Sequence, residues 1–355
     1  MKAIFASSIL LFLFLSTSCD NYKTQQGFST VTGKVGEILV VAENGVWESD
    51  LKECLDSNLT QWIMPYFPDV ATFELIHKTP AHFEKGVKRY RNILFLKIDP
   101  KFKGKKGRIV KHKDVWGKGQ IVIDIIAKDY AMLEKTCKSG LDEVHDIYDK
   151  GSWERLITHF DSYNNKTVKK DITNHFGIDI SLPARSKIVT RQKNFYRVEF
   201  PASSRPMEFE ASGGRSEDVG LILSGLMIWQ YDFVDSTQFE FDKLLEDRDT
   251  MLKYNMPHEI TGLYMGTQYE KIVYPEGNET VSKNGKVKGY EIRGMFKFTG
   301  RPIHSTGGAF WEFHFKHPKR NKMMCLSGYV DAAPTTSWTH PLREIQAILR
   351  SVEFK

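Results

Sequence analysis

The order of strand-like and helix-like segments differs between the two halves of this 355-residue chain, and that order most constrains its fold. In the first half, extended apolar runs alternate with segments of helical periodicity. Residues 37–42 form a nearly continuous apolar run, typical of a strand buried on both faces, and helical spacing follows Asp50 and Asp129. Further strands are expected over 73–76, 92–98, 107–113 and 120–127, and a short helix over 81–90. Alternation of this kind predicts a mixed sheet with covering helices.

In the second half, strands follow one another and helices stand apart. The expected strands are 178–183, 194–200, 221–233, 269–274, 288–298, 309–315 and 323–330, and the expected helices are 239–254 and 342–350. This order predicts an α+β sandwich, in which helices pack on a largely antiparallel sheet. The fold class is therefore α+β or mixed α/β, in two layered domains.

The chain is also longer than one hydrophobic core usually organises, since about 336 residues follow Cys19. We expect an N-terminal domain over 31–150, a helical connector over 151–176 and a C-terminal domain over 177–355. Helical spacing over 153–160 and 168–176, interrupted at Asn164, indicates the connector.

The first nineteen residues have the layout of a secretory signal. Lys2 precedes an apolar run over 4–15, and small residues over 16–18 lead into Cys19. The run is shorter than the roughly 20 apolar residues that span a bilayer. A cysteine directly after the small residues indicates a bacterial lipoprotein, in which residues 1–18 are removed and Cys19 is acylated. We expect a polar tether over 19–30 and a protein of the cell envelope, anchored by lipid such as palmitate to the periplasmic face or the outer membrane.

A basic run extends from Lys97 to Lys118, with few acids in it. Such a run could meet nucleic acid, anionic lipid headgroups or acidic glycan. Export argues against nucleic acid, and we interpret the run as a solvated loop before a hairpin.

Three cysteines follow Cys19, namely Cys54, Cys137 and Cys325. In an oxidising compartment an odd number leaves at least one free thiol or an intermolecular bond. A bridge between Cys54 and Cys137 is conceivable, and the sequence leaves it open. No CxxC spacing is present, so neither a redox nor a zinc motif is indicated.

Three blocks of the chain carry a resemblance to a known family. They are 36–41 followed by Trp47; Phe176-Gly177-Ile178 with Leu182-Pro183; and a set over 293–296, 307–310, 326–330 and 343–349. With these blocks the chain resembles a family of Bacteroidota envelope lipoproteins known only as a domain of unknown function. In that family Met usually precedes the paired glycines and Pro follows them, whereas Thr306 and Ala309 stand here. The resemblance implies a lipid-anchored envelope protein and no particular reaction.

The sequence contains no recognisable active-site motif. Phosphate-binding glycine loops and the GxSxG elbow are absent. His314 and His317 are three residues apart in an expected strand and so face opposite ways, which argues against a metal site that includes His304 and His340. Residues 305–308 are interpreted as a tight turn before a strand from Ala309, with an anion-binding nest as the alternative. Acids at 246, 247 and 249 are interpreted as an exposed helix face paired with Lys243, Arg248 and Lys253.

The sequence favours a binding or structural module without cofactor or metal. Its partners would be the membrane, through the lipid, and an envelope protein or cell-wall component. The candidate binding surface is Gly307, Gly308, Phe310 and Trp311, and exposed aromatics around Trp311 and Trp338 could line a groove for glycan or peptide. One alternative is a hydrolase acting on envelope glycan, peptide or lipid, with His304, His314 and a carboxylate such as Asp331 converging. The other is a carrier of an apolar ligand.

Overall fold

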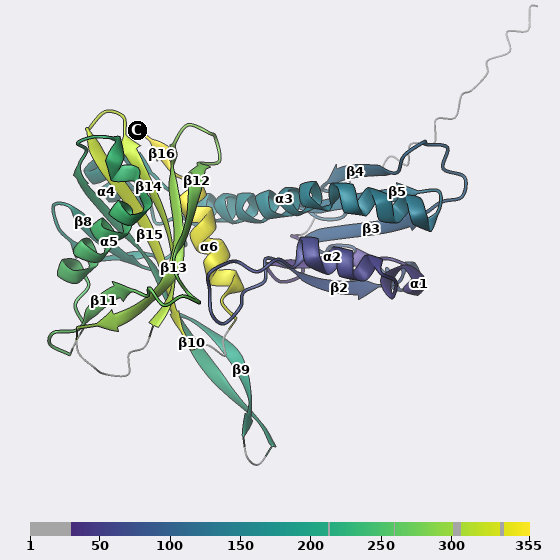
Figure 1. Ribbon diagram of the computed structural model, residues 1–355, viewed down its shortest axis with the longest axis horizontal. Helices are drawn as coiled ribbons and strands as arrows, with labels where there is room; N and C mark the ends of the chain where they lie inside the picture. The colour runs from purple at the N-terminus through teal and green to yellow at the C-terminus, as the bar shows by residue number, and fades with distance from the viewer. Residues whose placement is uncertain (1–29, 212–213, 259, 301–306, 334–336) are drawn as a thin grey trace, which may run out of the picture.

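The structure is a computed structural model that describes residues 30–211, 214–258, 260–300, 307–333 and 337–355. Cys19 and His304 lie outside the described residues. The chain forms two layered units joined by one long helix (Figure 1). We call residues 30–163 the N-terminal unit and residues 164–355 the C-terminal unit. The mixed α+β layout is the one the order of segments predicts.

The N-terminal unit is built on a mixed sheet of order β2-β1-β3-β5-β4, parallel except for β4. Its strands are β1 (Glu37–Val41), β2 (Glu74–Lys78), β3 (Asn92–Ile98), β4 (Arg108–Lys113) and β5 (Ile121–Ala127). Its helices are α1 (Asn44–Trp47), α2 (Leu51–Leu59) and the start of α3 (Tyr130–Tyr163). Helices α2 and α3 cover one face of the sheet. As expected for a strand buried on both faces, every residue of β1 is buried.

Loops rather than helices cover the other face of this sheet. Phe83 packs edge-on against Phe95 and Trp116, at ring-centroid distances of 5.0 and 5.4 Å. The short helix expected over 81–90 is therefore wrong, since only a 3₁₀ turn, η1 (Pro80–His82), forms there. The apolar spacing of this segment reflects loop packing on the sheet.

One continuous helix, α3, runs through the position at 150 where the sequence suggested that the connector begins. Asp129 caps its start by accepting from the backbone N–H of Met132. The first half of α3 packs in the N-terminal core, and Trp153, Ile157 and Phe160 pack in the C-terminal core. After a break at Asn164, α4 (Lys166–Phe176) resumes and ends at Gly177 with a left-handed φ of 71°.

The C-terminal unit is built on an antiparallel sheet of order β11-β13-β14-β15-β10-β8-β7, in which β12 also pairs with β13 and β9 with β10. The strands on the main path are β7 (Lys187–Arg191), β8 (Phe195–Glu199), β10 (Gly214–Asp232), β11 (Tyr264–Thr267), β13 (Lys288–Thr299), β14 (Gly307–His317) and β15 (Lys322–Ala332). The remaining elements are β6 (Ile178–Asp179), β9 (Ser203–Ala211), η2 (Ser236–Phe239), α5 (Phe241–Asn255), β12 (Glu276–Val281), α6 (Thr339–Arg350) and β16 (Glu353–Phe354).

Helices cover both faces of this sheet. Alternate side chains of β14, such as Phe313, face α6 and α4, whereas Phe310 faces α5. The strand expected over 269–274 is wrong, because β11 and β12 lie on either side of it and Ile272 is 77% exposed. Strand β9 was not expected; it pairs with the first half of β10 in a hairpin that projects beyond the sheet (Figure 1).

Polar contacts lock the two units together. Arg343 of α6 is only 1% exposed, contacts the Asp149 carboxylate of α3 and donates to the Thr72 carbonyl at 2.8 Å. Tyr66, in the loop between α2 and β2, donates to the carbonyl of Phe310 at 3.0 Å. These contacts fix the N-terminal unit against α6 and β14.

The three described cysteines are free thiols. Cys54 of α2 and Cys137 of α3 face the same core and interact electrostatically, and the pKa of the Cys137 thiol is raised to about 12, chiefly by burial and further by Cys54. Among the described residues, every helix is too short or too polar to cross a membrane.

Candidate binding cleft

The residues expected to form a binding surface lie in the core. Phe310 is 0% and Trp311 is 3% exposed, Gly308 is buried and Gly307 is half-buried. Trp338 is also buried, so the aromatic groove expected around Trp311 and Trp338 is wrong. The alternating aromatic residues belong to strand β14, which packs between two helical layers because helices cover both faces of the sheet.

Gly307 and Gly308 do not form the expected turn, since they begin β14. A Cβ on Gly308 would stand 2.0 Å from the carbonyl oxygen of Val330, so the glycine permits a close approach of strands. Residues 305 and 306 of the alternative anion nest lie outside the described residues.

An open cleft lies instead on the α5 side of the sheet, where α5 leaves part of the face uncovered. Its volume is about 720 Å³. We call it the sheet-face cleft. Its apolar lining includes Phe200, Leu223, Met256, Met265, Phe298 and Tyr329, and its polar lining includes Arg185, Lys187, Arg197, Glu199, His258 and Asp331. Leu223 is 43% exposed, which is unusual for a leucine in a central strand.

A row of three residues across neighbouring strands shapes the floor of the cleft. Gly225 of β10 pairs with Glu199 of β8 on one side and with Tyr329 of β15 on the other. A Cβ on Gly225 would stand 2.6 Å from the hydroxyl of Tyr329, so the ring of Tyr329 lies over the glycine. Glu199 also contacts Arg197 two residues away. Burial raises the pKa of Tyr329, against the opposing effect of the neighbouring Arg197 guanidinium.

Asp331 is the carboxyl group of the cleft without a counter-charge. It pairs in register with Leu223, and among the described residues its side chain has no hydrogen-bond or ion-pair partner. Burial raises its pKa. A partly desolvated carboxyl group with open hydrogen-bonding capacity can donate to or accept from a ligand.

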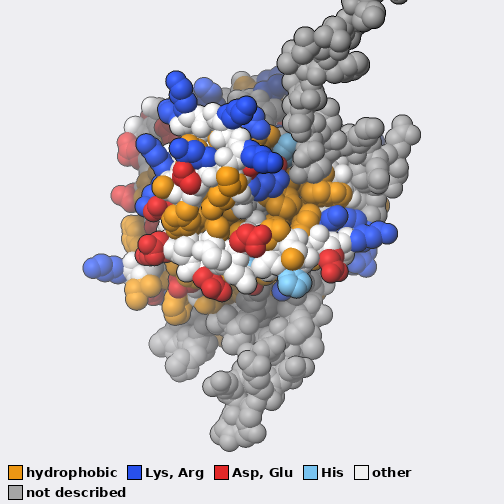
Figure 2. All heavy atoms as spheres, turned by 90° about the vertical axis from the view of Figure 1, so that its right-hand side faces the viewer, with side chains coloured by type: hydrophobic (Ala, Val, Ile, Leu, Met, Phe, Trp, Pro, Cys, Tyr) orange, Lys and Arg blue, Asp and Glu red, His pale blue; other side chains and the backbone are white. Residues whose placement is uncertain are grey.

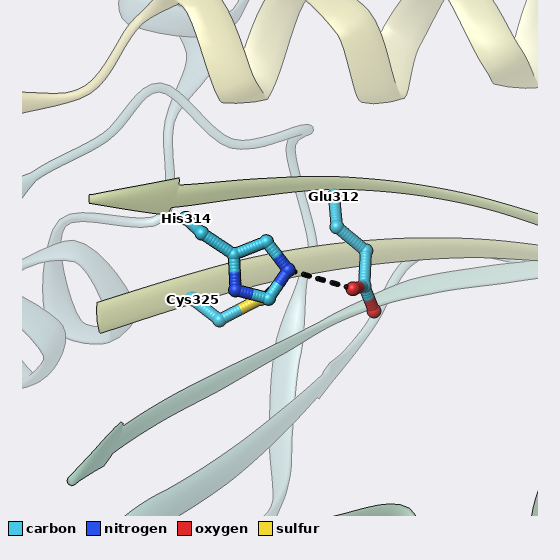
Figure 3. A group of neighbouring side chains, drawn as sticks. All are labelled: Glu312, His314 and Cys325. Carbon is cyan, nitrogen blue, oxygen red and sulfur yellow. Dashed lines mark hydrogen bonds and ion pairs between the residues drawn. The ribbon is translucent and has the colours of Figure 1, made fainter. Parts of the chain in front are cut away.

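A buried polar cluster lies on the α5 side of the sheet, and Figure 3 shows three of its side chains, Glu312, His314 and Cys325. Arg248 of α5 is 0% exposed and donates from Nε to Glu312 Oε1 at 2.8 Å, and Glu312 Oε2 lies 2.9 Å from His314 Nε2. Cys325 Sγ lies 3.6 Å from the same nitrogen. The Arg248 guanidinium also lies 3.6 Å from the centre of the Phe310 ring. The expectation that Arg248 lies on an exposed helix face is therefore wrong.

We tested whether Glu312, His314 and Cys325 fit a metal ion, because their donor atoms lie within 4.8 Å of one another. Burial alone would raise the pKa of Glu312, but Arg248 and His314 outweigh burial and lower it. Burial also raises the pKa of the Cys325 thiol well above its usual value, whereas zinc needs a thiolate. Because the Arg248 guanidinium already neutralises the carboxylate, this donor set does not fit a divalent metal. The cluster is a buried ion pair that holds α5 on the sheet.

The convergence required by the hydrolase alternative is not seen for its described residues. His314 pairs with Cys325, six residues before Asp331 on the same strand. Six residues of strand span about 20 Å. His314 and His317 face opposite sides of the sheet, as expected, and His317 lies 3.3 Å from the carbonyl of Gly177 on the α4 side.

A second cleft, of about 810 Å³, lies between the two units. Trp62, which is 57% exposed, lines it, and a Cβ on Gly36 would stand 2.7 Å from Thr339 Cγ2 across the interface. The contacts of Arg343 and Tyr66 hold both walls of this cleft.

Comparison with known proteins places the chain in a family. A family model described as "Domain of unknown function (DUF4837)" matches residues 165–351, more than half of the chain. The chain belongs to this family. A second model, described as "Domain of unknown function (DUF8532)", matches residues 31–161. Neither description names an activity. The search of curated proteins gives no match.

Solved structures show only a distant likeness. The Ran-binding protein Mog1p of Saccharomyces cerevisiae and a point mutant of protein Mog1 are each 10% identical to the chain, with TM-scores of 0.30 and 0.29. Each comparison covers 50% of this chain and 90% of the other. Scores this low carry no argument about fold or function.

Apart from Asp331, sequence reasoning missed the residues of the sheet-face cleft. The nearest signal was the pair Leu221 and Leu223, two apolar residues at strand spacing just before the glycine of the cleft floor. Nothing in the linear pattern shows that α5 stops short of them.

Proposed function

We propose that the protein is a binding module of the cell envelope, held on a membrane by acylated Cys19. The basic start, short apolar run and small residues before Cys19 support anchoring. Membership of a family without an assigned reaction is compatible with a non-catalytic role.

The observation that carries the binding role is the sheet-face cleft. Leu223 lies near the end of the β10–β15 pairing, and an apolar group that covered it would gain about 25 cal/mol per Å² of apolar surface buried. Leu223 and Phe298 would take an apolar part of a ligand, and Lys187 and Asp331 would meet its polar end. The cleft therefore fits an amphipathic molecule, either a small ligand or the side chains of an envelope partner.

Titration with 8-anilinonaphthalene-1-sulfonate, an anionic apolar fluorophore, tests this. Saturable binding by the folded protein is expected, with affinity reduced at least tenfold by Leu223→Arg. Ile272→Arg serves as the matched control, because Ile272 is 77% exposed and does not line the cleft. Equal binding by parent and both variants, at unchanged melting temperature, would reject the cleft as the binding site.

In-cell crosslinking tests the anchored role. A defined partner captured with the parent and lost with Cys19→Ala supports the proposal, together with palmitate labelling that Cys19→Ala abolishes. Labelling that persists in Cys19→Ala would reject anchoring at this residue.

The second candidate is a hydrolase of envelope glycan, peptide or lipid, favoured by one observation: His258 and Asp331 both line the sheet-face cleft. Hydrolysis of p-nitrophenyl butyrate and of purified sacculi should then fall in Asp331→Asn. Equal rates in parent and variant reject it.

The third candidate is a carrier of an apolar ligand, and only the apolar floor of the sheet-face cleft supports it. Lipid found by mass spectrometry in the purified protein would favour it.

A further inference from the structure

One segment of the N-terminal unit accounts for the charge of the whole protein, and the β3–β4 loop at one end of the unit carries a large part of it. Residues 97–118 carry eight lysines and one arginine against two aspartates, a net charge of +7, whereas the whole chain carries +6. The rest of the chain is therefore close to neutral. So strong a concentration of one sign in one segment indicates a surface for a partner of the opposite sign.

The structure places four of these lysines on the loop between β3 and β4. Lys101, Lys103, Lys105 and Lys106 are all exposed. Within the described part of the chain, none of the four forms an ion pair with a carboxylate. The aspartate of the loop, Asp99, accepts instead from the backbone N–H of Lys101. Their charge is therefore left for an external partner.

Apolar side chains lie among these charges. The loop begins directly after Ile98, which is 39% exposed, and carries the half-buried Phe102. The loop adjoins the carboxyl ends of parallel strands β3 and β5, at the same end of the unit as α1 (Figure 1). Figure 2 views this end and shows hydrophobic side chains at its centre, with lysine and arginine side chains mainly above and to the right of them and acidic side chains to the left and below. We call this the basic end face.

We propose that the basic end face docks on the anionic phospholipid surface of the membrane that carries the protein. Lysines of the loop pair with lipid phosphates, and the apolar centre enters the headgroup region, as amphipathic membrane-surface segments do. This inference deepens the proposed anchoring, because an acyl chain on Cys19 would hold the face close to its target.

The geometry of the chain permits this docking. The described chain begins at Thr30, which forms a β-bridge with Lys118, the last residue of the basic segment. Ten residues lie between Cys19 and Thr30, and the eleven Cα-to-Cα steps can extend over about 36–40 Å. β5, which separates Lys118 from the β3–β4 loop, has seven residues and so spans about 23 Å. The tether can therefore bring the end face to the bilayer.

Vesicle co-sedimentation tests the docking without the acyl anchor. The chain from residue 19 onward, carrying Cys19→Ala, is mixed with vesicles of phosphatidylcholine alone or with 30% phosphatidylglycerol. We expect binding only to the anionic vesicles. Changing the four loop lysines to glutamine should weaken it on the order of several hundred-fold, because each lysine near such a surface contributes about fivefold to binding.

The matched control changes four exposed lysines of the C-terminal unit to glutamine, namely Lys271, Lys283, Lys286 and Lys288. This variant has the same net charge as the loop variant and should bind as the parent does. Ile98→Ser should weaken binding several-fold without changing net charge. Equal weakening by both quadruple variants would show non-specific attraction and overturn the inference, as would no binding to anionic vesicles. If the protein does not bind anionic vesicles but palmitate labelling in cells is intact, only the docking is rejected and the proposed anchoring at Cys19 is not.

Discussion

The buried pair Arg248–Glu312 gives a sharp test of how the C-terminal unit is held together. Both side chains are fully buried and are joined at 2.8 Å. In Glu312→Gln the guanidinium stays buried without its counter-charge. Breaking a buried pair in this way costs about 3–5 kcal/mol, which for a unit of this size corresponds to a fall in melting temperature of about 10 °C. Arg248→Met should lower the free energy of unfolding by a similar amount, since the buried carboxylate then keeps His314 as a partner but loses the guanidinium.

The double variant Arg248→Met/Glu312→Gln separates the pair from the packing. Because neither charge is then buried alone, its cost should be smaller than the sum of the single costs by at least about 2 kcal/mol. Urea unfolding followed by tryptophan fluorescence gives these free energies. Additive single costs, or a Glu312→Gln variant as stable as the parent, would refute the reasoning.

The same pair predicts a pH dependence with a definite sign. The pKa of Glu312 is lower in the folded protein than in the unfolded chain, so its stabilising effect is complete above the unfolded value of about 4.3. That effect is lost as the pH falls through the lower, folded pKa. The difference in unfolding free energy between the parent and Glu312→Gln should therefore shrink below about pH 4. Zinc and EDTA should leave the melting temperature unchanged, and a zinc-induced rise that Cys325→Ser abolishes would contradict our assignment of the cluster.

Three further substitutions test other parts of the structure. Arg343→Met removes the contact with Asp149 between the two units and should lower the free energy of unfolding by about 3 kcal/mol. Calorimetry should then show two unfolding transitions, and a single transition at an unchanged temperature would contradict a stabilising contact between the units. Gly225→Ala places a methyl group 2.5 Å from the carbonyl oxygen of Val198 and 2.6 Å from the hydroxyl of Tyr329, and should lower the free energy of unfolding by about 1–3 kcal/mol and alter fluorophore binding in the cleft. Unchanged stability and binding would contradict the close packing of the cleft floor. Tyr66→Phe removes the hydrogen bond from the Tyr66 hydroxyl to the carbonyl of Phe310 and should lower the free energy of unfolding by about 1 kcal/mol in urea; an unchanged value would contradict a stabilising role for this bond.

Local patterns were sufficient for most elements. Strand β1 was predicted from the apolar run over 37–42, because a strand buried on both faces is apolar at every position. Helix α3 was predicted from the helical spacing of apolar residues after Asp129, because a helix buried along one stripe is apolar every three or four residues. The pattern failed over 81–90, where apolar residues at helical spacing pack as a loop on the sheet. It failed again over 269–274, where an exposed link joins β11 and β12.

The candidate site was harder to predict than the fold. Aromatic residues around Phe310 and Trp311 were interpreted as a possible surface, but both faces of β14 are covered by helices. Arg248 was placed on a solvated helix face because its neighbours are charged, yet it points into the sheet. The exposure of a side chain depends on which helices or strands pack against it, and the local sequence pattern does not show which elements these are.

The sequence by itself determined most of the elements, the α+β layout and the concentration of positive charge over 97–118. These depend on residue type and spacing along the chain. Only the tertiary structure decided that α5 leaves Leu223 uncovered and buries Arg248, and that basic and hydrophobic side chains gather on one end of the N-terminal unit. These depend on the packing of segments distant in sequence, which brings Asp331 beside Leu223 and Glu312 beside Arg248.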